Sequence, residues 1–211
     1  MNLLIGLIQV VILIFSAILH EISHGYVAER LGDPTARLMG RLTLNPKSHI
    51  DPIMSIILPL LLIISGSPVV FGAAKPVPID PFNFRDGRKD VALVSIAGPI
   101  TNVLIAITAT LIFRILALTG IGLNSFLPSL FFIIVYINLI LAIFNLIPIP
   151  PLDGSKVFAL LLPEKQASIY LSLGSIGFLI IFFLLLFPIG GFSFGSLIFD
   201  LVNFSQKLLG F

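Results

Sequence analysis

The sequence predicts an all-α integral membrane protein, a transmembrane bundle of about four full spans with a re-entrant or partial helix and a C-terminal interfacial helix. Composition is the first reason: of the 211 residues, 57% are hydrophobic and only 10% are charged, whereas a soluble domain carries about 25% charged residues. Clustering is the second. The few charges leave five long stretches without Lys, Arg, Asp or Glu, namely Met1–His20, Pro52–Ala74, Val91–Phe113, Ile115–Leu152 and Gln166–Phe199.

Composition also excludes several classes of protein. A chain this apolar is neither disordered, nor a coiled coil, nor a nucleic-acid binder, and a net charge of +2 is too small to indicate an anionic partner. It contains no cysteine, which excludes disulfides, thiol catalysis and thiolate metal sites. Because the loops are too short for a separate soluble module, we expect one transmembrane domain over 1–211, with a core at 1–155 and C-terminal helices at 156–211.

The first half of the chain predicts one long helix followed by less regular structure. Asn2–Leu31 is long enough to span and stops at a Gly-Asp-Pro sequence. It has no basic start and no small-residue cleavage site, so we interpret it as a retained helix and not a signal peptide. An alternating pattern predicts a short β segment near 37–45. Pro52–Ser65 is short for a span and contains a proline, which favours a re-entrant helix, whereas Gly66–Pro81 is rich in Gly and Pro and predicts extended chain.

The second half predicts two long helices, Asp90–Thr119 and Phe126–Ile147, and a Pro-Ile-Pro-Pro run stops the second one. Ser168–Phe187 is a further candidate for a full span. Gly195–Phe211 is apolar but carries one acidic and one basic residue, which is typical of a helix that lies in the membrane interface.

The most informative motif is a His-Glu-Ile-Ser-His sequence at 20–24, inside the first predicted helix. Residues i and i+4 share a helix face, so both imidazoles can reach one metal ion, while Glu21 lies close enough to contact a water on that metal. A catalytic Zn²⁺ takes three protein ligands, and the candidates for the third are His49, Asp51 and Asp153. We favour Asp153, because the prolines before it unwind the helix and present its carboxylate at the membrane edge.

Further motifs accompany this one. They are Asn-Leu-Ile-Pro-Ile-Pro-Pro-Leu-Asp-Gly at 145–154, Gly-Pro-Ile-Thr-Asn at 98–102, Gly-Arg-Leu-Thr-Leu-Asn-Pro at 40–46 and Phe-Gly-Ala-Ala-Lys-Pro-Val at 71–77. Together with the motif at 20–24, they resemble the site-2 protease family of intramembrane zinc metalloproteases. The last two resemble its short prokaryotic branch, which has no PDZ or CBS domain. The resemblance extends over residues 20–155.

This resemblance implies a function. His20, His24 and Asp153 would bind one Zn²⁺ per chain, and Glu21 would be the general base. The reaction would be hydrolysis of a peptide bond in or near a transmembrane segment of a membrane-protein substrate, as in regulated intramembrane proteolysis.

Candidate substrate contacts come from the same motifs and are Arg41, Leu42, Thr43, Leu44, His49, Asn102 and Asn145. The first four match the part of the family proposed to pair with substrate as an edge strand, which would satisfy the amides of an opened helix. The two asparagines are candidates for contacting the substrate backbone or the developing oxyanion, and equally for hydrogen bonds between packed helices. His49 fits either a place near the metal and substrate or a loop position at headgroup level.

Two alternative functions stay open from the residues alone. A prenyl-protein type of membrane zinc protease also uses His-Glu-x-x-His, but it takes its third ligand from a downstream Glu, and Glu164 is the only Glu after Glu29. The other alternative is a non-catalytic membrane zinc-binding scaffold. The presence of a base and a full ligand set argues against it.

The proposed ligands constrain the topology. The two long helices of the second half form a hairpin, so the histidines and Asp153 can meet only if 32–89 begins and ends on one side of the membrane. Basic residues gather in 30–89 and after Asp153, and basic loops favour the cytoplasm. We therefore expect a protein of the prokaryotic plasma membrane, in contact with the lipid bilayer, with an extracytoplasmic N-terminus and an active site toward the cytoplasmic face.

Overall fold

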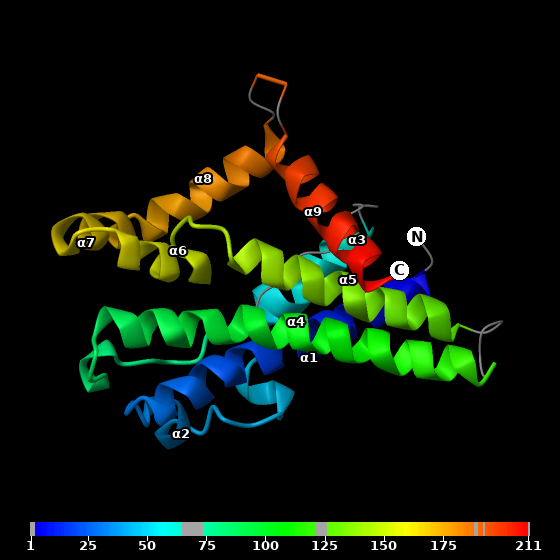
Figure 1. Ribbon diagram of the computed structural model, residues 1–211, viewed down its shortest axis with the longest axis horizontal. Helices are drawn as coiled ribbons and strands as arrows, with labels where there is room; N and C mark the ends of the chain where they lie inside the picture. Colours follow the sequence, from blue (N-terminus) through cyan, green and yellow to red (C-terminus); the bar gives the residue numbers. More distant parts are fainter. Residues whose placement is uncertain (1–2, 65–73, 121–125, 188–189, 192, 211) are drawn as a thin grey trace.

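The computed structural model describes residues 3–64, 74–120, 126–187, 190–191 and 193–210. Three long helices form its centre: α1 (Leu3–Arg30), α4 (Arg88–Leu118) and α5 (Leu127–Asn145). In the described residues these three are long and apolar enough to cross a membrane. They lie side by side, with α4 packed against both α1 and α5 (Figure 1). The described part of this membrane protein is thus all-helical and contains three helices of spanning length, where the sequence predicts about four spans.

Small residues explain the close packing of α4. Its buried positions include Ala97, Gly98, Asn102, Ala106 and Ala109, so one face of the helix lets neighbouring backbones approach. In a membrane, small side chains and interhelical hydrogen bonds replace the hydrophobic effect as the forces that hold helices together. The α4 helix therefore reaches α1 and α5 closely enough for polar side chains to bridge them.

The predicted β segment near 37–45 does not form. The short helix α2 (Thr35–Leu38) begins the segment, and the chain then turns at Gly40, whose φ is 63°. The amides of Gly40 and Arg41 are used in this turn, donating to the carbonyls of Arg37 and Ala36 at 2.9 Å each. Because these two amides bond within the turn, they cannot pair with a second strand, and the alternating sequence does not form a strand here.

After this turn, the chain forms two short helical turns and a partial helix. These are η1 (Pro46–Ser48), then six residues of π-helix in η2 (Pro52–Ile57) that run into the seven-residue α3 (Leu58–Ile64). Together they rise roughly 20 Å, less than the ~30 Å of a bilayer's apolar core. The described part of this segment is therefore shorter than a full span, and the re-entrant helix stays a prediction. Most of the predicted extended stretch, residues 66–73, lies outside the described residues, and its end at 74–80 has neither helix nor strand.

Asp33 ties the end of that extended chain to the end of α1. It is fully buried and accepts hydrogen bonds from the backbone of Asp80 at 2.8 Å, from Asn83 Nδ2 at 2.8 Å and from Thr35 N at 3.1 Å. Burial alone raises the pKa of this carboxyl, but the hydrogen bonds outweigh it and hold the pKa below its ordinary value. The turn η3 (Pro81–Asn83) follows and leads into α4.

Ser168–Phe187 does not form the single span that the sequence predicts. After α5 come the short α6 (Asp153–Phe158) and η4 (Ala159–Leu161), followed by α7 (Glu164–Ser172) and α8 (Gly174–Leu186). The helix breaks at Leu173, and α7 and α8 run in different directions (Figure 1). A glycine next to the break weakens helix propagation, and a second one, Gly177, lies so close to the carbonyl of Pro150 that no side chain fits there.

The C-terminal helix α9 (Phe194–Leu209) packs one face against α5, where the sequence predicts contact with the membrane interface. Its buried Ile198 and Val202 join Val135 and Leu139 of α5 in one apolar cluster. At its end, Arg114 of α4 donates from Nη2 to the carbonyl of Leu209 at 2.6 Å. An apolar stripe with spacing i, i+4 fits a neighbouring helix as well as a lipid surface, which explains the error.

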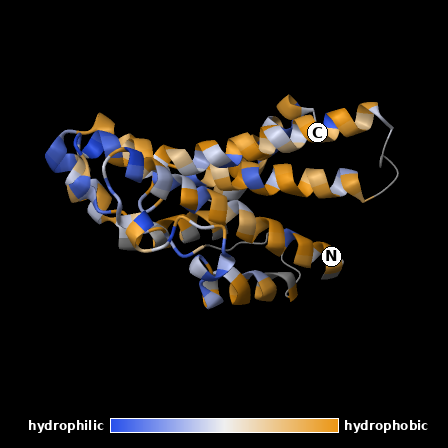
Figure 2. Ribbon diagram, turned by 90° about the horizontal axis from the view of Figure 1, so that it is seen from below, coloured by the Kyte–Doolittle hydropathy of each residue, from blue (hydrophilic) through white to orange (hydrophobic). Residues whose placement is uncertain are grey.

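Polar residues gather at one end of the bundle. Figure 2 shows the hydrophilic ribbon concentrated at the end opposite the two termini. In Figure 1 this end carries α6, α7 and the segment that enters α4. The structure therefore gathers the hydrophilic segments toward one end of the molecule, which is the arrangement that the predicted topology requires.

Candidate metal centre

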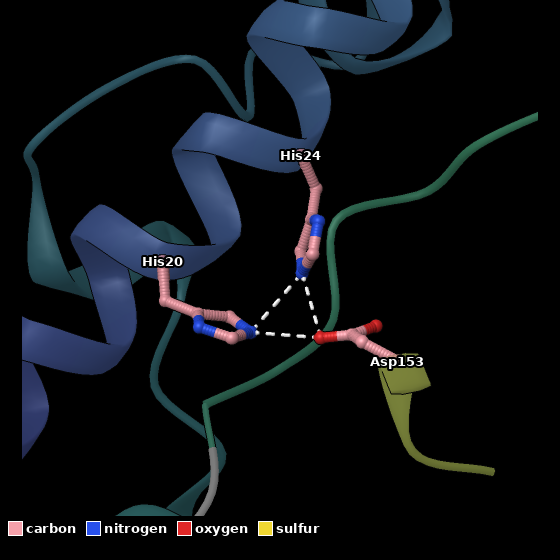
Figure 3. Close-up of side chains that lie close together, drawn as sticks. All are labelled: His20, His24 and Asp153. Atoms are coloured by element: carbon pink, nitrogen blue, oxygen red, sulfur yellow. Dashed lines mark hydrogen bonds and ion pairs between the residues drawn. The ribbon is translucent and has the colours of Figure 1, made fainter. Parts of the chain in front are cut away.

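Three side chains that are distant in sequence meet inside the bundle. His20 and His24 lie one turn apart on α1, and Asp153 is the first residue of α6 (Figure 3). Asp153 Oδ2 is 3.2 Å from the Nε2 atom of each histidine, and the two Nε2 atoms are 3.0 Å apart. All three residues are buried, at 6–7% exposure. Within the described residues, they form the one group of three His, Cys, Asp or Glu side chains close enough to share a metal ion.

The partner of His24 determines which of its nitrogens faces this group. Its Nδ1 lies 2.7 Å from the backbone carbonyl of Val94 on α4. A carbonyl oxygen only accepts, so Nδ1 carries the hydrogen and Nε2 of the neutral ring has a free lone pair. The backbone of α4 therefore holds His24 in the form in which a metal binds it.

A chain of buried amides does the same for His20. Asn138 donates from Nδ2 to the carbonyl of Ile134 at 2.8 Å, which orients its amide and turns Oδ1 toward Asn102. Asn102 donates to that Oδ1 at 2.9 Å, so its own Oδ1 faces His20 Nδ1 at 2.6 Å. Both asparagines are fully buried. His20 therefore also carries its hydrogen on Nδ1 and presents a lone pair at Nε2.

This arrangement fits a cation. Two imidazole lone pairs and a carboxylate oxygen face one another within 3.2 Å, and such acceptors repel unless a positive charge lies between them. Two nitrogens and one oxygen are also a common ligand set for catalytic zinc, which keeps a fourth position open. Gly98 leaves room beside them, because a Cβ there would lie 2.5 Å from His20 Nε2 and 2.6 Å from His24 Nε2.

Asp153 uses its two carboxylate oxygens differently. Oδ2 faces the histidines, whereas Oδ1 accepts a hydrogen bond from Lys156 Nζ at 3.1 Å, one turn along α6. The Lys156 side chain is 35% exposed and reaches the carboxylate from the polar end of the bundle. The ion pair leaves one oxygen of Asp153 for the metal position, which favours binding through a single oxygen.

Glu21 lies beside this group without joining it. It is half-buried on the neighbouring face of α1, and its Oε2 accepts a hydrogen bond from the backbone amide of Val77 at 2.7 Å. With Oε2 held in this way, Oε1 remains to accept a proton. A carboxylate next to a metal position, but outside the ligand set, has the placement of a general base.

Comparison with known proteins identifies the family. The sequence description of peptidase family M50 matches residues 115–188. A protein of Bacillus subtilis named "Putative zinc metalloprotease YwhC" is 36% identical over 187 residues, which cover 87% of this chain and 82% of that protein. The chain belongs to peptidase family M50, the site-2 protease family.

A second M50 relative extends the match along the chain. A protein of Mycobacterium tuberculosis named "Putative zinc metalloprotease Rip2" is 33% identical over 204 residues, which cover 92% of this chain and 73% of that protein. No solved structure gives a significant match. At the level of the family, the chain is therefore a membrane zinc metalloprotease.

The other predicted site residues of this M50 chain do not meet at the metal position. His49 and Asp51, the alternative third ligands, lie outside the group of three. Asn102 lies behind His20, fully buried, in the interhelical position that the sequence left as an equal alternative to substrate contact. Asn145 is half-buried, and its Nδ2 donates to the carbonyl of Leu141 at 2.9 Å.

The residues predicted to pair with substrate lie in the turn after α2. Arg41 is buried and donates from Nη2 to the carbonyls of Lys75 and Pro76, while Thr43 accepts a hydrogen bond from His49 Nε2 at 2.8 Å. Leu42 is half-buried and Leu44 is exposed. They border the extended chain that contacts Glu21 rather than forming a strand of their own.

Sequence reasoning missed several partners of the three candidate ligands. Among them are Val94, Gly98, Asn138 and Lys156, none of which it assigned to the site. A signal was present for Asn138, because an amide inside a predicted span needs a hydrogen-bond partner in the bundle. The role of Val94 left no signal, since the carbonyl is common to every residue and only the register of α1 against α4 brings it to His24.

Proposed function

We propose that the protein is an intramembrane zinc metalloendopeptidase that hydrolyses peptide bonds in or near the transmembrane segments of other membrane proteins. The observation that carries this proposal is the convergence of two imidazole lone pairs and one carboxylate oxygen inside a bundle of spanning helices. The general base that such chemistry needs is the residue next to the first ligand, Glu21. Family membership supports the same reaction.

Each residue has a distinct task in this reaction. His20, His24 and Asp153 would hold one Zn²⁺, which supplies Lewis-acid activation of a water molecule and of the substrate carbonyl. Glu21 accepts a proton from that water at Oε1 as the water oxygen bonds to the carbonyl carbon. It then gives the proton to the amide nitrogen as the carbon–nitrogen bond breaks. Val77 holds Oε2 in place during both transfers.

The alternative zinc protease with a downstream Glu ligand is not supported by the geometry. Glu164 begins α7, is exposed, and lies outside the group of three candidate ligands. Asp153 Oδ2 lies 3.2 Å from both histidines, which supports Asp153 as the third ligand.

The decisive experiment combines two substitutions on purified protein in liposomes. We expect Glu21→Gln to retain one Zn²⁺ per chain but to lose all cleavage of a panel of membrane-spanning peptides, because the amide has no basic oxygen to take the proton. Asp153→Ala should lose both zinc and cleavage. Zinc is measured by elemental analysis and cleavage by mass spectrometry. Wild-type protein that holds zinc and cleaves no membrane-spanning peptide, in liposomes or in cell membranes, contradicts the proposal and favours the scaffold.

We also propose an orientation, with the polar end of the bundle in the cytoplasm of a prokaryotic cell and the N-terminus outside. The support is the hydrophilic end of the bundle (Figure 2) together with the gathering of Lys and Arg in residues 30–89 and after Asp153. Because the chain has no cysteine, single cysteines at Lys47, Arg85 and Thr119 are unique labels. We expect an impermeant thiol reagent added outside intact cells to label only Thr119→Cys. Labelling of the first two from outside would reverse the orientation.

A further inference from the structure

The extended chain at 75–77, which we call the strap, runs past Glu21 and is held through its backbone. Lys75 N donates to the carbonyl of His49 at 2.7 Å. Arg41 Nη2 donates to the carbonyl of Lys75 at 2.8 Å and to that of Pro76 at 3.1 Å. Val77 N donates to Glu21 Oε2 at 2.7 Å. Each residue of the strap therefore makes a backbone hydrogen bond, and the last of these reaches the proposed base.

Side-chain packing places the strap against α1 at the same point. Val77 is 6% exposed. A Cβ on Gly25 would lie 2.9 Å from Val77 Cγ1 and 2.7 Å from Leu42 Cδ2, so the strap and the turn that holds it both fit where α1 has no side chain. Gly25 lies one turn from Glu21, on the same face of α1. The contact that orients the carboxylate is thus part of a close-packed surface.

The two residues that hold the strap are buried, and each side chain bonds a backbone carbonyl. His49 is fully buried, and its Nε2 is 2.8 Å from the carbonyl of Thr43, which only accepts, so Nε2 carries the hydrogen. Arg41 is 9% exposed and forms no ion pair within the described residues. Burial of a guanidinium that is paired only with neutral carbonyls costs free energy. The contribution of Arg41 to the fold is therefore its pair of hydrogen bonds to the strap.

We propose that Arg41 and His49 are positioning residues for the catalytic base, acting through the backbone of the strap, and not contacts for the substrate. The inference rests on the proposed function of Glu21. Arg41 donates to the two carbonyls before Val77. His49 accepts from Lys75 N through its backbone carbonyl, and its side chain holds that part of the chain by donating to the carbonyl of Thr43. Together they hold the strap so that the Val77 N–H binds Glu21 Oε2. The two proposed histidine ligands are held from the other side, by α4, and Asp153 is held by Lys156 on α6, so none of the three bonds to the strap.

The two possible roles of Arg41 and His49 predict changes in different kinetic constants, kcat for positioning the base and KM for binding the substrate. A residue that orients the base affects the chemical step, so its loss lowers kcat and leaves KM near its original value. A residue that binds the substrate equally in ground and transition states raises KM instead. The position of a catalytic group is sensitive, because a displacement of about 1 Å costs on the order of 100-fold in rate.

The first test compares Arg41→Met with Arg41→Lys, and His49→Leu with His49→Gln, in liposomes with a membrane-spanning peptide that the wild type cleaves. We expect both apolar variants to keep one Zn²⁺ and an unchanged KM, with kcat lower by about 10- to 100-fold. Lys and Gln each retain a donor and should recover part of the rate. Arg37→Met is the matched control, since Arg37 is exposed and pairs with Glu29 outside the strap. It should behave as wild type.

The second test removes one hydrogen and no side chain, so it does not depend on whether a buried Arg can be replaced. Incorporation of the α-hydroxy acid of valine at Val77 converts its amide into an ester, which lacks the N–H. We expect kcat to fall about 10-fold with zinc retained. The same exchange at Ile79, whose amide donates no hydrogen bond within the described residues, is the control.

Several results would overturn the inference. A raised KM with unchanged kcat in the Arg41 and His49 variants would make them substrate contacts. A raised kcat would mean that the strap restrains Glu21 and does not orient it. Unchanged kinetics in the ester would remove the strap from catalysis, yet leave the proposed function intact as long as Glu21→Gln is inactive. Failure of the proposed function is a separate result, in which zinc-loaded wild type cleaves nothing.

Discussion

The two faces of α1 at the site are held by different kinds of structure. On the face toward α4, His20 and His24 are buried and bonded to a neighbouring helix, one through Asn102 and the other through the carbonyl of Val94. On the neighbouring face, Glu21 is half-buried and bonded to an amide of extended chain. In the proposed function, metal binding would thus depend on the packing of long helices, whereas proton transfer would depend on a segment without helix or strand.

The two kinds of structure suit the two functions proposed for them, metal binding and proton transfer. Helix packing is stiff, and a metal site needs ligand atoms fixed to within a fraction of an ångström. The extended chain bonds one oxygen of the Glu21 carboxylate and leaves the other, which in the proposed reaction would serve first an attacking water and then a leaving nitrogen. Substitutions that disturb one face should therefore leave the other intact, and the three predictions below test this separation.

Gly98→Ala should have the largest effect. Its methyl group would lie 2.5–2.6 Å from the Nε2 atoms of His20 and His24, which is closer than van der Waals contact allows, so we expect the purified protein to contain no stoichiometric zinc. Alanine has a higher helix propensity than glycine, so the substitution should not destabilise α4 itself. Gly174→Ala is the control, because its methyl would lie 3.9 Å from the nearest side-chain atom. Elemental analysis of both variants decides, and normal zinc in Gly98→Ala would contradict the geometry of the site.

The same contrast explains what could be predicted from the sequence. The spacing of His20 and His24 is a property of any helix, so the ligand pair followed directly from the motif. Asp153 followed from the prolines that end the helix before it. The structure confirms that these three side chains lie together. Local rules of backbone geometry are sufficient for such residues.

The predictions that were wrong concern segments whose structure depends on long-range packing. Arg41 and Thr43 lie in an alternating sequence that is typical of a strand, but the Arg41 side chain bonds the distant carbonyls of Lys75 and Pro76, and its amide bonds within the turn at Gly40. The stripe on α9 fits lipid and protein equally, and only its contact with α5 distinguishes them. The break at Leu173 goes with the close approach of Gly177 to Pro150. None of these contacts has a period that a sequence pattern can reveal.

Asn102→Leu should have an intermediate effect on the helix-packed face. It removes the acceptor that keeps His20 Nδ1 protonated, and loss of such a partner lowers metal affinity by about 10- to 100-fold. The buried amide of Asn138 also loses its partner, which costs about 1–3 kcal/mol of stability. Competition with a zinc chelator measures the affinity and thermal unfolding measures the stability. Asn145→Leu, in which the amide bonds to its own helix, is the control that should change zinc affinity little.

Lys156→Met should have the smallest effect, and its size tests how far the metal face extends toward solvent. The Lys156 side chain is 35% exposed and bonds only the outer oxygen of the buried Asp153, and solvent screening of so exposed a lysine limits the contribution of the pair to about 1 kcal/mol. We therefore expect zinc affinity to fall less than about fivefold, with the difference shrinking as salt is added. Lys165→Met, at an exposed position on α7, is the control. A fall of 100-fold or more, insensitive to salt, would place Lys156 among the groups that orient the ligands and would move the boundary of the metal face outward from the helix interior to the polar end of the bundle.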